Sequence, residues 1–344
     1  MSPWGSALIA AITGLGTSIA LAGTKVYLAR RRVLDVPNHR SSHSLPTLRG
    51  AGLGIVAGLL LGLASSAPTL SSATSELTRL AIVAPMIVSI ALVGFMEDLR
   101  GLRVSARMAS QLLIFGFTSG LLTLTENLPP HLALLAWLGG AFYVNAANFM
   151  DGANGISSLH GTLVGGYYAL VGTLEDGSGL TAAGIVVSVA FLSFLPWNVG
   201  RSRVFMGDVG SYALGAGAWS LAVWALSYGV ALITAVAPLI VYTIDVLHTL
   251  IKRMAKRAPL HEAHREHTYQ RLMPHFQSHA IPTGMTTGAT AGCAGLGIWA
   301  LIAPESTPWT LGGMVIVAFA YLLSPTLPPL TNLPSRKGLM DESV

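Results

Sequence analysis

Long apolar segments alternate with short polar segments along almost the whole 344-residue chain. A helix needs about 20 apolar residues to cross a bilayer, and eleven segments come close to that length. They cover residues 5–25, 51–68, 80–96, 108–125, 131–149, 157–174, 179–197, 210–227, 230–250, 282–303 and 309–325. The charge-free run 209–244 is too long for one span, so we divide it at Ser227-Tyr228-Gly229, where a tight turn fits. Since barrel strands would alternate apolar and polar residues, the pattern predicts an all-α integral membrane protein with about eleven transmembrane helices.

The composition agrees with this class. Hydrophobic residues make up 52% of the chain and charged residues only 10%, whereas soluble domains carry roughly 25% charged residues. The single cysteine, Cys293, lies in a predicted span, which excludes a disulfide within the chain and a CxxC metal site. We expect one polytopic membrane domain over residues 1–330, followed by a tail over 331–344.

Basic residues indicate the orientation of the spans. Of the 20 Lys and Arg residues, only Arg79 lies outside the loops that follow spans 1, 3, 7 and 9 and the tail. The positive-inside rule therefore predicts an N-terminus outside and a cytoplasmic C-terminus. This pattern explains the net charge of +5 by topology and contact with anionic headgroups, not by binding of nucleic acid.

The polar clusters fall on loops of this same predicted cytoplasmic side, at residues 30–50, 97–107, 145–158, 198–211 and 251–281. One of them, Asn145 to Ser158, separates two apolar segments with three asparagines and an aspartate. Polar groups next to membrane spans are costly and usually functional. We therefore expect one site at the cytoplasmic surface of the membrane, built from all five loops.

Four carboxylates lie in these loops. Glu97 and Asp98 end span 3, where the helix dipole disfavours anions; a salt-bridge cluster with Arg100 and Arg103 is the structural alternative, and such pairs contribute little. Asp151 and Asp208 precede spans 6 and 8, so helix N-capping alone would explain them. Capping does not explain the nearby asparagines, which are Asn145, Asn148 and Asn154. Carboxylates without thiolates favour a hard cation, Mg²⁺ or Mn²⁺.

Basic side chains complete the predicted site. Arg40, His43 and Arg49 in the first loop have the chemistry to hold phosphate, although a basic loop that sets topology is the alternative. His264 and His267 are three residues apart, so a helix would place both on one face, and a solvated amphipathic helix is the alternative there. The spacing of this histidine loop does not match HExxH, which makes a metalloprotease remote. Carboxylates, arginines and histidines together indicate phosphoryl transfer to or from a lipid.

These motifs together resemble the polyprenyl-phosphate N-acetylhexosamine-1-phosphate transferases, over roughly residues 30–325. The matching stretches are Asp35-x-Pro with Arg40-x-x-His43 and Arg49-Gly; Glu97-Asp98; Asn145-x-x-Asn148-Phe-Met-Asp151-Gly-x-Asn154-Gly; Phe205-Met-Gly-Asp208-Val-Gly-Ser211; and His264-Arg-Glu-His267. The last resembles the branch that initiates O-antigen. Glu97 stands where the family usually has aspartate, and Asn154 replaces an aspartate of some branches. The run of three consecutive histidines of the more distantly related peptidoglycan enzyme is absent, which argues against a muramoyl-pentapeptide substrate.

The resemblance implies that a UDP-N-acetylated sugar gives its sugar-1-phosphate to undecaprenyl phosphate in the bacterial plasma membrane, releasing UMP. It implies Mg²⁺ on Asp208 with Asn148 or Asp151, and Asp98 as a base or orienting group. Catalytic roles are predicted for Glu97, Asp98, Asp151, Asp208 and His267, and substrate contacts for Arg40, His43, Arg49, Asn145, Asn148, Asn154, His264 and Arg265. The sugar of the donor stays open among GlcNAc, FucNAc and QuiNAc. The resemblance also allows a homodimer as the assembly. The alternative function is that of a transporter of a lipid-linked or anionic substrate.

Overall fold

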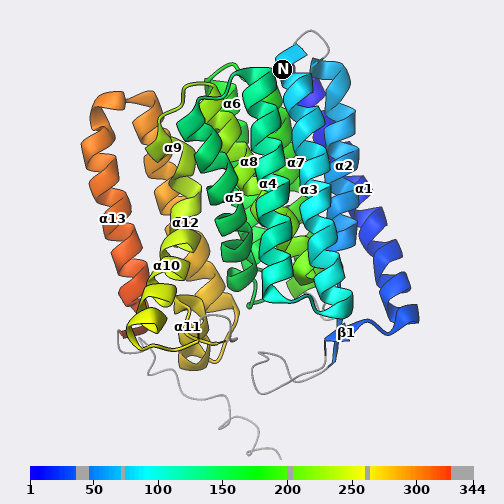
Figure 1. Ribbon diagram of the computed structural model, residues 1–344, viewed down its shortest axis with the longest axis vertical. Helices are drawn as coiled ribbons and strands as arrows, with labels where there is room; N and C mark the ends of the chain where they lie inside the picture. Colours follow the sequence, from blue (N-terminus) through cyan, green and yellow to red (C-terminus); the bar gives the residue numbers. More distant parts are fainter. Residues whose placement is uncertain (36–45, 71–73, 200–203, 260–263, 327–344) are drawn as a thin grey trace, which may run out of the picture.

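The computed structural model describes residues 1–35, 46–70, 74–199, 204–259 and 264–326, so Arg40 and His43 lie outside the described residues. Helices run side by side along the long axis of the molecule (Figure 1). The long helices are α1 (Pro3–Arg31), α2 (Gly52–Ser66), α3 (Thr74–Arg100), α4 (Val104–Glu126), α5 (Pro130–Met150), α6 (Ile156–Leu174), α7 (Ser178–Val199), α8 (Gly207–Ser227), α10 (Ile240–Ala255), α12 (Ala280–Ile302) and α13 (Thr307–Leu323). Shorter helices are α9 (Leu232–Val236) and α11 (Thr268–Phe276), with 3₁₀ turns at Ala67–Leu70, Ala237–Leu239, Pro304–Ser306 and Ser324–Thr326.

A helix occupies each of the eleven segments predicted to span the membrane, and among the described residues ten helical segments are long and apolar enough to do so. The eleventh, α6, carries Ser157, Ser158 and His160, all of which are buried inside the protein. Polar side chains of membrane helices face the bundle interior because lipid cannot hydrogen-bond them. The class predicted from the sequence, a helical integral membrane protein, is therefore confirmed.

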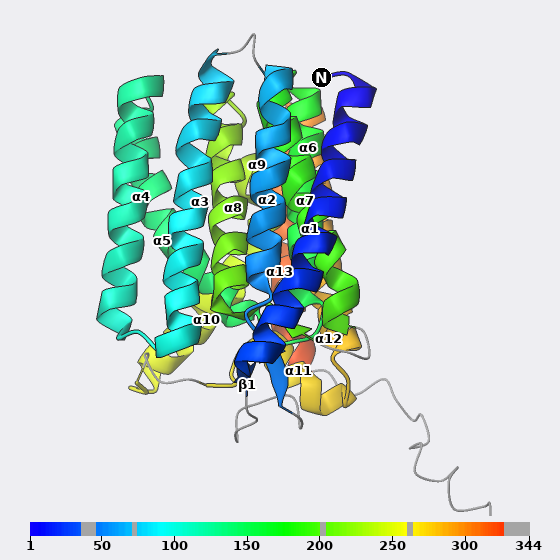
Figure 2. The ribbon, with the colours of Figure 1, turned by 90° about the vertical axis from the view of Figure 1, so that its right-hand side faces the viewer.

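Helix α8 forms the centre of the bundle (Figure 2), and 94% of its apolar stretch is buried. Its sequence is rich in glycine and alanine, which lets neighbouring backbones approach closely. At Gly94 of α3, an added Cβ would lie 2.4 Å from the carbonyl oxygen of Asp208. The contact between the end of α3 and the beginning of α8 thus requires a residue without a side chain. The predicted break after Ser227 is also found, since α8 ends there and Gly229 has φ +84°.

A small sheet, which the sequence did not predict, joins the ends of three segments. Its strands are β1 (Leu34–Asp35), β2 (Thr47–Arg49) and β3 (Val204–Phe205), in the order β1-β2-β3. Strand β2 pairs antiparallel with β1 and parallel with β3, and Arg49 is the partner of Phe205. Phe205 precedes Asp208 by three residues, so this register brings Arg49 close to Asp208, although the two are far apart in the sequence.

The sheet and α11 lie at the same end of the bundle, and the N-terminus lies at the other end (Figures 1 and 2). The described parts of the five predicted loops meet at the sheet end, as the hydrophobic pattern required. Which end faces the cytoplasm stays a prediction from the distribution of basic residues.

Candidate active site

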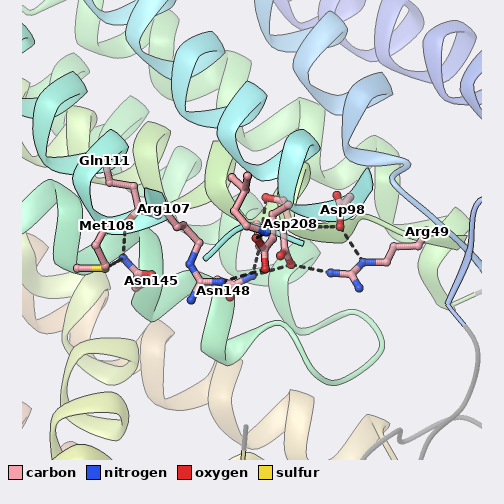
Figure 3. A network of polar contacts seen from close by, with 11 residues as sticks. Arg49, Asp98, Arg107, Met108, Gln111, Asn145, Asn148 and Asp208 are labelled. Carbon is pink, nitrogen blue, oxygen red and sulfur yellow. Dashed lines mark hydrogen bonds and ion pairs between the residues drawn. The ribbon is translucent and has the colours of Figure 1, made fainter. Parts of the chain in front are cut away.

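Asp208, in the first turn of α8, lies at the centre of a polar network (Figure 3). Its Oδ1 accepts hydrogen bonds from Arg49 Nη2 at 2.9 Å and from Asn148 Nδ2 at 3.0 Å. The same amide nitrogen of Asn148 lies 3.0 Å from the hydroxyl of Ser211, which is fully buried. Two of the predicted site residues, from two other segments of the chain, therefore converge on the carboxylate of a third.

Asp98 lies beside this carboxylate and is almost wholly buried. It accepts hydrogen bonds from the backbone N–H groups of Asp208 and Val209, at 2.9 and 3.0 Å, and pairs with Arg49 Nε at 2.7 Å. The side chain is 1% exposed. Asp98 ends α3, but its carboxylate stabilises the N-terminus of α8, where free amide hydrogens favour an anion. The dipole of α3 disfavours a carboxylate at this position, but the N-terminus of α8, which the sequence did not place here, compensates for it.

Arg49 bridges both carboxylates through different guanidinium nitrogens. Burial alone would lower the pKa of Arg49, but Asp208, Asp98 and Asp35 outweigh it and raise that pKa above its ordinary value. The guanidinium is permanently charged, and the side chain keeps 34% of its surface exposed. A residue predicted to hold phosphate thus lies between two carboxylates and still faces open space.

Glu97 makes different contacts from Asp98. One oxygen accepts from the backbone N–H of Leu102 at 2.6 Å, and the other pairs with Arg107 at 3.2 Å. The alternative of a cluster with Arg100 and Arg103 is not what the structure shows, because Arg107 is the partner. Glu97 holds the turn between α3 and α4, and a catalytic role for it stays a prediction.

The capping alternative for Asp151 and Asp208 is wrong. The N-cap of α6 is Gly155, with φ +83°, and that of α8 is Met206; neither helix has a side-chain cap. Asp151 instead caps the C-terminus of α5, and its N–H donates to Asn148 O at 3.2 Å. Burial, followed by the neighbouring Asp208 carboxylate, raises the pKa of Asp151 to about 7, although Arg49 opposes the shift. Asp151 is therefore partly protonated at neutral pH, and a bound cation would compete with that proton.

The histidine loop is not helical where the sequence predicted a shared helical face. Helix α11 begins at Thr268, after both histidines, and yet the rings of His264 and His267 lie 5.0 Å apart. The alternative of a solvated amphipathic helix is also wrong for His267, which is 2% exposed. Burial, followed by the proximity of His267 and Arg253, lowers the pKa of His264 to about 4. His264 is consequently neutral at physiological pH, whereas Arg265 is exposed.

Sequence reasoning gave no role in the site to Asp245 of α10. Its carboxylate lies 2.9 Å from His267 Nδ1 and is fully buried. The available signal was a single carboxylate inside an apolar span, which is expensive unless it is paired. The sequence contained that signal but not the partner, since the two residues are on different elements.

The remaining asparagines lie in two places. Asn145 donates to Gln111 Oε1 at 2.6 Å and to Ala141 O at 2.8 Å, beside Arg107 (Figure 3). The backbone of Asn154 contacts the beginning of α12, through His279 and Thr283. Asn145 therefore faces the same side as Asn148, and the substrate contact predicted for Asn154 stays a prediction.

A cavity of about 780 Å³ is lined by Asn148 of this network and by both histidines of the histidine loop. Its polar lining comes from α3, α4, α5, the segment after α10 and α11, namely Glu97, Arg107, Asn145, Asn148, His264, His267 and Gln270. Its apolar lining includes Met108, Leu112, Leu138, Phe142 and Leu250. The cavity thus offers charged and hydrogen-bonding groups together with an apolar surface, as a molecule with a phosphate and a hydrocarbon chain would need.

The side chains that could ligate a metal fit a hard cation that takes only a few of its ligands from the protein. Within the described ranges, no three His, Cys, Asp or Glu side chains are grouped to hold a metal ion. Asp208, Asp151 and Asn148 nevertheless supply only oxygen ligands, and Mg²⁺ usually takes one or two carboxylates with waters and substrate phosphates. These residues therefore suit Mg²⁺ together with a bound diphosphate, and do not suit a closed cage.

Comparison with known proteins places this fold and site in a class. The model of Glycosyl transferase family 4 matches residues 80–226, a stretch that contains Asp98, Asn148, Asp151 and Asp208. The protein is an integral membrane protein in which residues 80–226 match a glycosyl transferase family 4 domain. The predicted family resemblance is thereby confirmed, and the O-antigen branch stays a prediction.

The relatives are enzymes of polyprenyl phosphates and cell-wall precursors. The chain is 27% identical over 265 residues to the probable undecaprenyl-phosphate N-acetylglucosaminyl 1-phosphate transferase of Bacillus subtilis (strain 168), with 72% of each chain covered. It is 29% identical over 293 residues to the phospho-N-acetylmuramoyl-pentapeptide-transferase of Symbiobacterium thermophilum, covering 73% of this chain and 85% of the relative. It is 25% identical over 362 residues to the decaprenyl-phosphate N-acetylglucosaminephosphotransferase of Mycobacterium tuberculosis, covering 93% and 89%.

Proposed function

We propose that the protein transfers N-acetylhexosamine-1-phosphate from a UDP-sugar to undecaprenyl phosphate, as the first step of a cell-surface polysaccharide. The observation that carries this proposal is the network of Arg49, Asp98, Asn148 and Asp208 at the end of the bundle where the cavity, both polar and apolar, also opens. The names of the three relatives support the same reaction class.

In the proposed reaction, an oxygen of the lipid phosphate attacks the β-phosphorus of the donor. The bond from that phosphorus to the bridging oxygen breaks, and UMP leaves with the oxygen. Phosphate monoesters have a second pKa near 6, so the attacking oxygen is largely ionised at neutral pH. Both oxygens of Asp98 already accept from protein donors. We therefore assign Asp98 the task of orienting Arg49 and the N-terminus of α8, in preference to that of a base.

Arg49 and the α8 N-terminus would contact phosphate oxygens, since both favour anions. Asp208 would hold Mg²⁺ with Asn148 or Asp151, and the ion would supply positive charge that stabilises the diphosphate. His264 and His267 would contact the donor from the other wall of the cavity, with Arg265 nearby in the same loop. The apolar wall, with Leu112 and Phe142, would accept the first isoprene units of the acceptor.

The proposed location is the bacterial plasma membrane, with this end of the bundle in the cytoplasm. The support is the distribution of Lys and Arg, which avoids the opposite loops except at Arg79. Donor and leaving nucleotide would then enter and leave on the cytoplasmic side.

The test uses the full chain in nanodiscs with undecaprenyl phosphate, Mg²⁺ and a panel of UDP-GlcNAc and UDP-activated 6-deoxy N-acetylsugars. We expect release of UMP with at least one donor, and only when both lipid and metal are present. Asp208→Ala should abolish the release; full activity in this variant would contradict the metal assignment. No UMP from any donor, together with transport of an unmodified substrate across vesicles, would overturn the proposed function.

A further inference from the structure

Asp245 forms a second buried carboxylate centre, separate from Arg49 and Asp208. It is fully buried in α10, one of the membrane-spanning helices. A buried carboxylate is very costly unless hydrogen bonds compensate it. Among the described residues, Asp245 accepts hydrogen bonds from Thr268 N at 3.1 Å, Tyr321 OH at 2.9 Å and Thr249 Oγ1 at 3.4 Å, and His267 Nδ1 lies 2.9 Å from its Oδ1. Both oxygens of the carboxylate thus accept from protein donors, and Oδ1 is the oxygen that faces the His267 ring.

This arrangement decides the protonation of one ring nitrogen of His267. Because Oδ1 of Asp245 also accepts from the N–H of Thr268 at 3.2 Å, we assign the hydrogen of its contact with His267 to Nδ1. The other nitrogen, Nε2, is then the ring atom that can accept a proton or a hydrogen bond. The ring is stacked near Phe149, with centroids 5.9 Å apart, and near Tyr269, at 6.2 Å. Its orientation is therefore held at the edge by Asp245 and at the faces by aromatic side chains.

His267 also lines the cavity that contains Asn148. The ring consequently connects a buried carboxylate to the space where the proposed donor would lie. This is the geometry in which a second residue fixes the tautomer of a histidine and stabilises its positive form. Titratable and charged groups near this pair include His264, whose ring is 5.0 Å away, Tyr269, Tyr321, and the ion pair of Arg253 and Glu266.

We propose that Asp245, supported by Tyr321, is a positioning residue that keeps His267 in the Nδ1–H tautomer and directs Nε2 toward the phosphates of the bound donor. The role in turnover rests on the proposed function; the tautomer does not. Tyr321 belongs to α13, at the edge of the bundle, and α10, α11 and the end of α13 meet at the loop end (Figure 1). The last described helix is thereby part of the site, although the family match ends at residue 226.

The direct test is nitrogen NMR of the full chain in nanodiscs, with ¹⁵N-labelled histidine. The chain has 10 histidines, so the signals of His267 are assigned by their loss in His267→Gln. We expect a protonated Nδ1 and an unprotonated Nε2 in the substrate-free protein at neutral pH. In Asp245→Asn the amide can donate to Nδ1, so we expect the reverse tautomer. An Nε2–H tautomer in the unaltered protein would overturn the proposal, whatever reaction the protein catalyses.

Kinetics of UMP release give the second readout. Removal of a residue that orients a reactive histidine costs roughly 10- to 100-fold in activity, and we expect Asp245→Asn to lose this in kcat with little change in KM. Tyr321→Phe should show a smaller loss of the same kind. Tyr167→Phe is the matched control, because it removes another buried tyrosine hydroxyl, which donates to Thr234 O at 2.6 Å away from the site. We expect unchanged kinetics there.

The outcomes separate the two proposals. If the unaltered protein releases no UMP with any donor, the proposed function fails, and the NMR result still decides the role of Asp245. If UMP is released and Asp245→Asn keeps both the original tautomer and the original kcat, the positioning role is wrong. If Tyr321→Phe and Tyr167→Phe lose kcat equally with equal losses of thermal stability, the contribution of Tyr321 is only structural, and its part of the proposal is wrong.

Discussion

Arginine lies between two carboxylates at both ends of this bundle. At the loop end, Arg49 pairs with Asp98 and Asp208 at 2.7 and 2.9 Å. At the opposite end, Arg79 pairs with Glu126 at 3.0 Å and lies 3.9 Å from Glu76. The ionic composition is the same in the two clusters, so charge alone does not distinguish a site from a structural contact.

The surroundings of the two arginines differ in three ways. Asp98 and Asp208 lie at the N-terminus of α8, whose amide hydrogens attract anions, and Asn148 adds a neutral donor. Arg79 instead lies over the ring of Tyr228, 5.4 Å from its centroid, and is only 14% exposed. The cavity beside Arg79 holds about 40 Å³, against about 780 Å³ near Asn148. The opposite cluster ties helices together, whereas the loop-end cluster has room for a phosphate ligand.

The largest expected difference between the two ends of the bundle is the effect on kcat of replacing each arginine. Arg49 uses two nitrogens to reach two carboxylates, and a lysine ammonium cannot reproduce this fork. We expect Arg49→Lys to lower kcat for UMP release roughly 100-fold, comparable to the loss of one transition-state donor. Arg79→Lys is the control and should leave kcat little changed. Equal losses in the two variants would mean that both clusters serve the fold only.

The second comparison concerns the glycines that flank α8. Gly207 has φ +72°, and a Cβ there would lie 2.5 Å from Asp98 Oδ2; Gly229 has φ +84° and open space within 4 Å. A left-handed alanine costs about 1–2 kcal/mol at either position, but only Gly207→Ala also displaces Asp98. We therefore expect similar losses of thermal stability from backbone strain, an additional loss in Gly207→Ala, and roughly tenfold lower kcat in that variant alone.

The third comparison concerns the buried acids. Removing the charge of one member of a buried ion pair lowers the free energy of unfolding by about 3–5 kcal/mol. We expect Asp98→Asn to approach this loss, because the substitution also weakens the capping of α8. Glu126→Gln breaks the matching pair at the opposite end without any helix cap, so its loss should be smaller. Thermal unfolding in one detergent measures both. A larger loss in Glu126→Gln would contradict the importance assigned to the α3–α8 contact.

The smallest effect concerns pH at Asp151. The pKa of this carboxyl, about 7 and thus above its ordinary value, means that the folded protein keeps a proton that the unfolded chain loses near pH 4. Its contribution to the stability of the metal-free protein is full below pH 4 and is lost as pH rises through 7. The apparent affinity for Mg²⁺ should change in the opposite sense, weakening about fivefold from pH 7 to pH 6 if Asp151 must ionise.

Asp151→Asn provides the control for that prediction. In this variant both the decline of melting temperature with pH, measured with EDTA, and the pH dependence of Mg²⁺ binding should flatten. If Asp151→Asn keeps the same pH dependence as the unaltered protein, Asp151 is neither the titrating group nor a metal ligand, and its function is to end α5.

Much of the fold and part of the site were predictable. The spans follow from the cost of apolar residues in water, and the clustering of the loops follows from which sides carry Lys and Arg. The convergence of Arg49, Asn148 and Asp208 was predicted as a shared surface, and the structure shows direct contacts. The shared helical face of His264 and His267 was wrong, because Asp245 holds the backbone of Thr268 and α11 begins only there.

By itself, the sequence determined the membrane class, the helical segments and the residue types at the site. Those properties depend on local composition and on periods of a few residues, which a single chain displays directly. Only the tertiary structure decided which carboxylate pairs with which cation, that Asp98 caps α8, that a small sheet carries Arg49 to Asp208, and that Asp245 holds His267. Each of these contacts joins residues far apart in the chain, and its geometry depends on how helices approach one another, which no local pattern records.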